Sequence, residues 1–154
     1  MRNQSLLAMS ILLGFGGFGC SGEDMHSDTG ELSATLAEER AETARHREAC
    51  ELAGSMSDVL DDLDRHVQAM DGMMLRMDAG MHEMSACSAS DTSRISDGLS
   101  EVRAELSDHH ARLGAMSDLT AAHRECTRYA PMMEATLLSM KMGVDGMSCM
   151  MMHR

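Results

Sequence analysis

One stretch decides the helical character of this chain: Met70-Asp-Gly-Met73-Met74-Leu-Arg-Met77-Asp-Ala-Gly-Met81-His-Glu-Met84. Apart from one adjacent pair, its methionines recur at steps of three and four residues. This spacing places the thioethers along one face of an α-helix. The same spacing begins at Val59 and continues to Cys87. The stretch therefore belongs to a helix predicted for about residues 57–86.

Three more helices are predicted from the same spacing of apolar residues. The first covers about residues 31–53, and the third carries its apolar positions over residues 95–123. Pro131 predicts the boundary before the fourth helix, because proline suits a first helical turn and disfavours helical geometry in the preceding residue. No stretch alternates with the period of a strand. The chain is therefore predicted to be all-α, with an antiparallel four-helix bundle over residues 31–154.

The chain also repeats itself at an offset of 77 residues. His46-Arg47-Glu48 returns as His123-Arg124-Glu125, and Met70-x-x-Met73-Met74 returns as Met147-x-x-Met150-Met151. Such a repeat is typical of a duplicated structural unit. It predicts a bundle made of two repeated helical hairpins, at about residues 31–87 and 107–154.

Composition and charge exclude several classes of function. The formal net charge of −12 argues against binding to nucleic acid. The 154 residues include 19 methionines, two phenylalanines, one tyrosine and no tryptophan, so a core must be built from aliphatic and methionine side chains. No nucleotide-binding loop, nucleophile motif or metalloprotease motif occurs. The protein is therefore predicted not to be an enzyme.

Residues 1–19 have the features of a signal peptide. Arg2 supplies the positive charge, and an apolar run over residues 6–18 ends in small residues. The following Gly19-Cys20-Ser21 resembles the lipobox of bacterial lipoproteins, in which the cysteine is lipidated after cleavage. The resemblance implies that Cys20 carries a membrane anchor; the alternative is ordinary secretion with Cys20 as a spare thiol. The small, polar composition after Cys20 predicts a flexible spacer over residues 20–30. The resemblance also implies a place in the bacterial cell envelope, facing the periplasm or the surface.

Four further cysteines predict two disulfides in an oxidising compartment: Cys50, Cys87, Cys126 and Cys149. In an antiparallel bundle, Cys50 and Cys126 fall at the same end, which favours a Cys50–Cys126 bond and leaves Cys87 with Cys149. A hairpin that turns near residues 71–72 favours Cys50–Cys87 with Cys126–Cys149 instead. Spacing alone leaves both pairings open.

The methionines predict either a ligand set or a core. Thioethers spaced along a helix are soft ligands that suit Cu(I), and on this hypothesis the protein binds or buffers a copper ion. The ligands would be Met70, Met73, Met74, Met77, Met81, Met84, Met147, Met150 and Met151, with His66, His82 and His153 as auxiliary ligands. The alternative is a structural or protein-interaction lipoprotein in which methionine only fills the core. Burial of the methionines at residues 70–84 among leucines would favour this alternative.

Carboxylates precede four histidines by four residues each: Glu42/His46, Asp62/His66, Asp78/His82 and Glu105/His109. Such pairs either stabilise a helix surface or orient an imidazole that binds a metal.

The predicted partners are a membrane, reached through the N-terminal lipid, a metal ion and an envelope protein.

Overall fold

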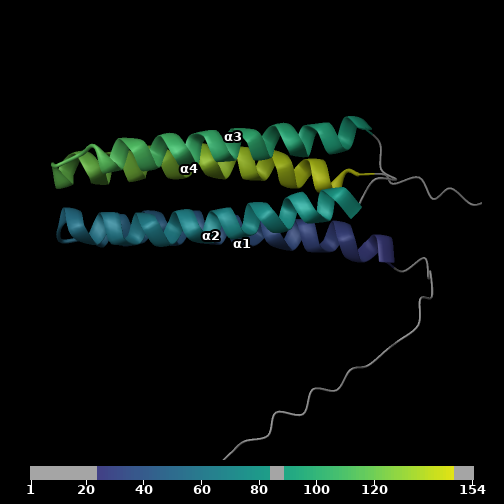
Figure 1. The fold of residues 1–154 in the computed structure, drawn as a ribbon, viewed down its shortest axis with the longest axis horizontal. Helices are drawn as coiled ribbons and strands as arrows, with labels where there is room; N and C mark the ends of the chain where they lie inside the picture. Colours follow the sequence, from purple (N-terminus) through teal and green to yellow (C-terminus); the bar gives the residue numbers. More distant parts are fainter. Residues whose placement is uncertain (1–23, 84–88, 148–154) are drawn as a thin grey trace, which may run out of the picture.

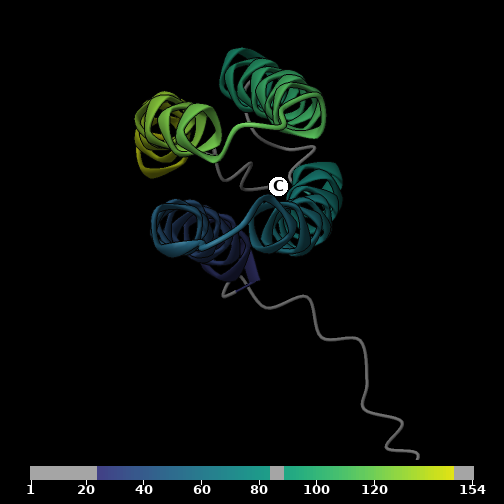
Figure 2. The same ribbon diagram turned by 90° about the vertical axis from the view of Figure 1, so that its left-hand side faces the viewer.

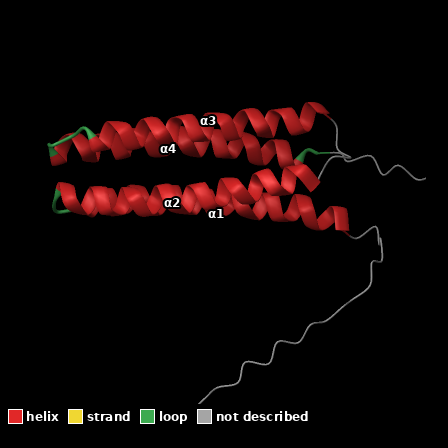
Figure 3. Ribbon diagram, in the orientation of Figure 1, coloured by secondary structure: helices red, strands yellow, loops and turns green. Residues whose placement is uncertain are grey.

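The computed structural model describes residues 24–83 and 89–147, and it contains four helices within these ranges. They are α1 (Asp24–Leu52), α2 (Met56–Glu83), α3 (Ala89–Gly114) and α4 (Leu119–Asp145). The helices run alternately up and down, with the α1–α2 and α3–α4 turns at the same end (Figure 1). No strand occurs in the described ranges (Figure 3). The predicted all-α four-helix bundle is confirmed.

Viewed along their axes, the helices form a square in which α1 lies next to α2 and α4, while α3 lies diagonally opposite α1 (Figure 2). Each helix buries the face that the spacing predicted. On α2 and α4 this face carries many of the described methionines, which pack with leucines from α1 and α3. The core residues of this part are Leu32, Leu36, Met70, Met73, Met74, Met77, Ile95, Leu99, Val102, Leu106, Tyr129, Met133, Leu137, Met140 and Val144.

Polar side chains cap the helices that follow the two described turns. The Ser55 hydroxyl accepts a hydrogen bond from the backbone N–H of Asp58 at the start of α2. Asp118 caps α4, where its carboxylate accepts from the backbone N–H of Ala121. Such caps satisfy donors that have no partner within the helix. At Gly72 α2 continues without a break, so the hairpin does not turn there.

Pro131 lies inside α4, and the predicted helix boundary at this position was wrong. The third helix ends at Gly114 instead, and the Asp118 cap starts the fourth helix thirteen residues before the proline. A proline within a helix loses one backbone hydrogen bond. Here its ring is exposed, while Ala130 and Met133 on either side of it are buried. Their packing offsets the loss and keeps α4 continuous.

The hairpins repeat at an offset of 63 residues. Adding 63 to the bounds of α1 and α2 gives residues 87–115 and 119–146, which match α3 and α4 to within two residues. The offset of 77 instead aligns residues within α1 with residues on both sides of the α3–α4 turn. A continuous helix and a turn are not equivalent structural units, so the helix bounds favour the offset of 63.

Candidate functional site

Four aromatic rings, one from each helix, meet at the centre of the bundle. They belong to His46 on α1, His66 on α2, His109 on α3 and Tyr129 on α4, and all four residues are 0% exposed. The rings of His46 and His66 are stacked with their centroids 4.2 Å apart, and those of His109 and Tyr129 are stacked at 3.8 Å. The two stacks meet edge to face. We call these four residues the ring cluster.

Carboxylates from neighbouring helices hold two of the imidazoles. Nδ1 of His46 lies 2.8 Å from Oδ2 of Asp62, and Nδ1 of His109 lies 3.1 Å from Oε1 of Glu125. The first pair joins α1 to α2 and the second joins α3 to α4. The acid four residues earlier on the same helix, which the sequence pairs with each histidine, is not the partner in either case. The pairing is therefore between helices and buried, unlike a surface pair.

Arginines keep these carboxylates ionised. Burial by itself would raise the pKa of Glu125, but hydrogen bonds from Arg128, His109 and Arg112 outweigh it and lower this pKa to about 2. Burial also opposes ionisation of Asp62, and hydrogen bonds from Arg45 and His46 nevertheless lower its pKa. Because an ionised carboxylate can only accept hydrogen bonds, Nδ1 of each facing imidazole must carry the proton.

The remaining nitrogens of these two imidazoles face each other. Nε2 of His46 and Nε2 of His109 are 3.1 Å apart. Burial is the main cause that lowers the pKa of His46 to about 4, despite its bond to Asp62. Burial lowers the pKa of His109 to about 3 despite its bond to Glu125. Both rings are thus neutral near pH 7, and a neutral imidazole with a proton on Nδ1 has only a lone pair on Nε2. Two buried acceptors therefore meet without a donor between them.

The other two rings, those of His66 and Tyr129, form a hydrogen bond with each other. Nδ1 of His66 donates to Oε1 of Glu42 at 3.1 Å, and its Nε2 accepts from the Tyr129 hydroxyl at 3.0 Å. Burial raises the pKa of Tyr129, so the phenol keeps the proton that it donates. Hydrogen bonds from Arg45 and His66 outweigh burial and lower the pKa of Glu42 to about 2. Within the ring cluster, only the pair of His46 and His109 has acceptors facing each other.

A disulfide lies beside this pair. Cys50 of α1 and Cys126 of α4 are bonded, with their Cα atoms 6.4 Å apart. This is one of the two pairings that the spacing left open. The partners predicted for the remaining bond, Cys87 and Cys149, lie outside the described residues, as does Cys20. One ligand atom each from His46, His109 and Cys126 lies within 4.8 Å of the others. These are the types of atom that bind transition metals once the sulfur is a thiolate.

Most of the described methionines from the predicted ligand set lie in the core. Met70, Met73, Met74 and Met77 are at most 6% exposed, and Met81 and Met147 are partly buried against the same core. Such burial among leucines is the result expected if methionine fills space. Of the predicted auxiliary ligands, His66 belongs to the ring cluster and His82 is exposed. Four predicted ligands lie outside the described residues: Met84, Met150, Met151 and His153.

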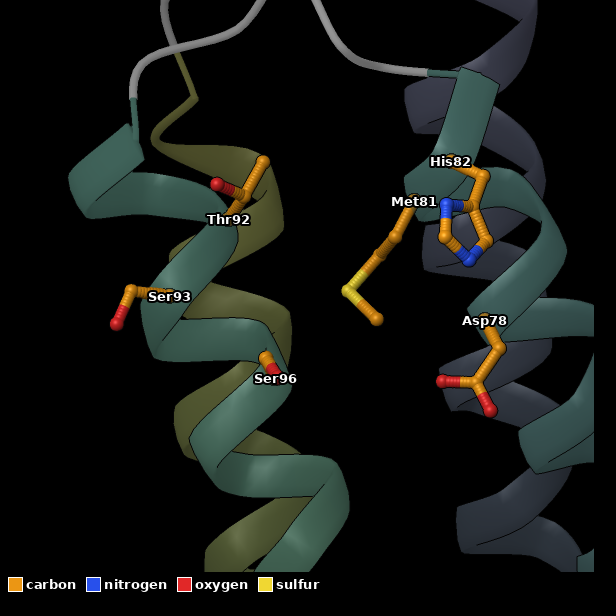
Figure 4. A pocket seen from close by; sticks show the side chains of 6 residues that line it. All are labelled: Asp78, Met81, His82, Thr92, Ser93 and Ser96. Carbon is orange, nitrogen blue, oxygen red and sulfur yellow. The ribbon is translucent and has the colours of Figure 1, made fainter.

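Met81 and His82 line a pocket between α2 and α3. Its volume is about 390 Å³, and Asp78 shares the α2 side with them. The α3 side carries Thr92, Ser93 and Ser96, and the Met81 side chain extends toward them (Figure 4). Met81 supplies the only sulfur in the described lining. The structure therefore does not gather the described methionines around an open metal site here.

The sequence predictions missed His46, His109 and Tyr129 as site residues. A repeated pattern marks two of them: Leu-x-Glu-x-Arg-Ala-Glu-x-x-x-His occurs at residues 36–46 and again at 99–109. The offset is 63, and it also relates several polar residues around the ring cluster: Glu42/Glu105, Asp62/Glu125, Arg65/Arg128 and His66/Tyr129. Searching for repeats at this offset would have identified the site.

Comparisons with known proteins found no relative of this chain. No protein family matches the chain, and neither the curated proteins nor the solved structures include a match. Within the described residues, no helix has the length and apolar character needed to cross a bilayer.

Proposed function

We propose that this protein is a metal-binding protein of the bacterial cell envelope, which holds a copper ion between Nε2 of His46 and Nε2 of His109. The observation that carries the proposal is that Nε2 of His46 and Nε2 of His109, both buried, face each other at 3.1 Å. A buried acceptor without a donor costs free energy. A bound cation removes this cost, because both lone pairs then have a partner.

The distance between the two nitrogens supports a metal more than it supports a simple packing contact. Two imidazole nitrogens bound to a tetrahedral metal at about 2.0 Å are separated by about 3.3 Å. The separation of 3.1 Å between His46 and His109 is close to this value. The carboxylates of Asp62 and Glu125 add the outer contacts that orient metal-binding histidines. The site would thus need little rearrangement to accept the ion.

Copper is favoured over other divalent metals by its general affinity for nitrogen ligands. The surroundings also favour a soft ion, because Met70 on α2 and Met133 on α4 lie one helical turn beyond His66 and Tyr129 and are buried. In this proposal the described methionines pack beside the site, and the imidazoles replace them as the primary ligands. Capture and storage of the ion need no enzymatic step.

The proposed location in the cell envelope rests on the N-terminal sequence. The signal peptide and the lipobox-like Gly19-Cys20-Ser21 support export and lipid attachment at Cys20. The predicted flexible spacer over residues 20–30 is wrong for residues 24–30, because α1 begins at Asp24. The net charge of −12 keeps the bundle soluble and attracts cations to its surface.

The test is copper binding by the full chain purified from its envelope. His109→Gln removes one Nε2 ligand, and His110→Gln is the matched control, because His110 is its neighbour on α3 with a half-exposed side chain. We expect His109→Gln to lose at least about tenfold in copper affinity, since even outer contacts of metal sites are worth ten- to a hundredfold. His110→Gln should bind like the wild type. Equal affinity in both variants would refute the site.

The buried methionines of α2 favour a second candidate function. If the protein is a structural or interaction module of the envelope, the methionines only fill its core and neither imidazole needs a metal. Replacing Met70, Met73, Met74 and Met77 by leucine separates the explanations. Loss of copper in this variant alone would identify thioether ligands. If neither the methionine variant nor His109→Gln changes copper binding, the structural role remains.

A further inference from the structure

We infer that Cys126 is a third, redox-gated ligand of the metal site, which joins His46 and His109 when the Cys50–Cys126 disulfide is reduced. This inference rests on the proposed function and names its regulation. The oxidised site offers two imidazole nitrogens. The reduced site offers two nitrogens and a thiolate, which is the ligand set of trigonal copper sites.

The position of Cys126 on α4 supports this role. It follows Glu125, which holds His109, and it precedes Tyr129 of the ring cluster by three residues, so all three lie on the buried face of the helix. The ligand atoms of Cys126, His46 and His109 lie within 4.8 Å of one another. On a tetrahedral metal, nitrogen and thiolate sulfur are about 3.6 Å apart. A released Cys126 side chain must therefore shift by only about 1 Å.

The two sulfurs of the disulfide are not equivalent. Sγ of Cys50 lies 3.9 Å from the backbone carbonyl oxygen of Ala122, to which a thiol can donate its proton. After reduction, Cys50 can thus remain a neutral thiol with a partner. No such carbonyl contact is found for Cys126 in the described structure, and His46 and His109 are the residues with which it could share a metal ion. This asymmetry assigns the ligand role to Cys126.

The redox step is a thiol–disulfide exchange with a dithiol reductant. The dithiol gives two electrons and two protons to the Cys50–Cys126 bond, leaving two thiols in the protein and a disulfide in the reductant. The metal then displaces the proton of the Cys126 thiol and forms a metal–sulfur bond, so that one proton is released for each ion bound. Both sulfurs are fully buried, so the reductant must gain access through transient opening of the bundle.

The test uses Co(II), whose thiolate complexes absorb in the near ultraviolet through charge transfer from sulfur to metal. The full chain is examined oxidised, and again after treatment with dithiothreitol and transfer into reductant-free, oxygen-free buffer. Cys50→Ser and Cys126→Ser form a matched pair, because both variants lack the disulfide and both retain the other three cysteines. Circular dichroism verifies that the two variants are equally folded. Both are reduced before Co(II) is added.

We expect the charge-transfer band in the reduced wild type and in Cys50→Ser, but not in the oxidised wild type or in Cys126→Ser. Cys50→Ser should bind Co(II) at least about tenfold more tightly than Cys126→Ser. Co(II) binding without the band in every form would overturn this inference and leave the proposed imidazole site standing. An equal band in Cys126→Ser would also overturn it. Absence of Co(II) binding in every form would also overturn this inference, whereas the proposed function stands or falls with the copper affinities of His109→Gln and His110→Gln.

Discussion

His46 and His109 lie on diagonally opposite helices, yet their Nε2 atoms are only 3.1 Å apart at the centre of the bundle. Each is held from behind by an ionised carboxylate, Asp62 or Glu125, and these acids are related by the same offset of 63 residues as the histidines. Each hairpin therefore contributes one histidine and the carboxylate that holds it, and the two histidines meet at the centre of the site.

Glu39 provides a prediction about pH. Its two carboxylate oxygens are buried without a hydrogen-bond partner in the described part of the chain. Burial raises its pKa to about 7, although Arg76 and Arg103 oppose the shift. The folded state thus keeps a proton that the unfolded state loses above its ordinary value of 4.5. Stability should fall as the pH rises from about 4.5 to about 7, and the full penalty should remain above pH 7.

Glu39→Gln should remove this dependence. Relative to the wild type, the variant should gain up to about 3 kcal/mol in the free energy of unfolding above pH 7 and little at pH 4. Urea unfolding at several pH values measures the difference. The control is Glu38→Gln, because Glu38 lies beside it on α1 with an exposed side chain paired to Arg76. Parallel pH profiles for Glu39→Gln and the wild type would contradict the prediction.

Substitution of glycine by alanine should have opposite effects on stability at Gly72 and at Gly98. Alanine normally stabilises a helix interior by up to about 1 kcal/mol relative to glycine. A Cβ at Gly72 would meet nothing within 4 Å, so Gly72→Ala should show this gain. A Cβ at Gly98 would clash with Cγ of Met140 and lie 2.8 Å from its sulfur. Gly98→Ala should therefore destabilise the protein by about 1–3 kcal/mol.

Thermal unfolding of both variants measures the difference between the two sites. A Met140→Ala background provides the control, because it removes the side chain that the new Cβ would strike. Gly98→Ala should be neutral or stabilising in that background. If Gly98→Ala is equally destabilising with and without Met140, the packing described here is incorrect at this position.

The disulfide should contribute substantially to stability, because it joins residues that are 76 apart in sequence. Cross-linking of this kind stabilises mainly by restricting the unfolded chain, typically by about 2–4 kcal/mol. Replacing both Cys50 and Cys126 by serine should lower the free energy of unfolding by at least this amount. Urea unfolding under oxidising conditions measures it. The loss should be much smaller when the wild type is first reduced, and an equal loss would argue against the bond.

Met77 tests whether the described methionines act as core. Its side chain is 0% exposed within the leucine-rich part of the core. Met77→Leu keeps the volume and should cost less than about 1.5 kcal/mol, whereas Met77→Ala should cost about 2–5 kcal/mol. Copper content should be unchanged in Met77→Leu. A large loss of copper without a loss of stability would show that this sulfur is a ligand.

The sequence predicted the buried faces well, because helical spacing of apolar residues reports packing directly. His46 and His109 lie on these faces, but the sequence predictions did not identify them as a site. Their partners, Asp62 and Glu125, lie sixteen residues away on the next helix, a relationship that depends on how the helices turn and pack. The matching His-Arg-Glu segments favour an offset of 77 residues, whereas the helix bounds repeat at 63. The physically meaningful repeat was the less obvious one that relates His66 to Tyr129.

Helix ends were predicted less reliably than helix faces. Pro131 carries a strong local preference for a helix start, and the structure overrides it. The boundary comes instead from Asp118, whose cap and following buried residues act together. The disulfide partner of Cys50 needed the same three-dimensional information, because two pairings satisfied the spacing equally well.

The central claim is tested most directly by X-ray absorption spectroscopy of the full chain loaded with copper while the Cys50–Cys126 disulfide is intact. The account predicts that the nearest atoms to copper are imidazole nitrogens at about 2.0 Å, and that this signal is lost in His109→Gln and kept in His110→Gln. A shell made only of sulfur atoms at about 2.3 Å would contradict the account and return the metal to the methionines.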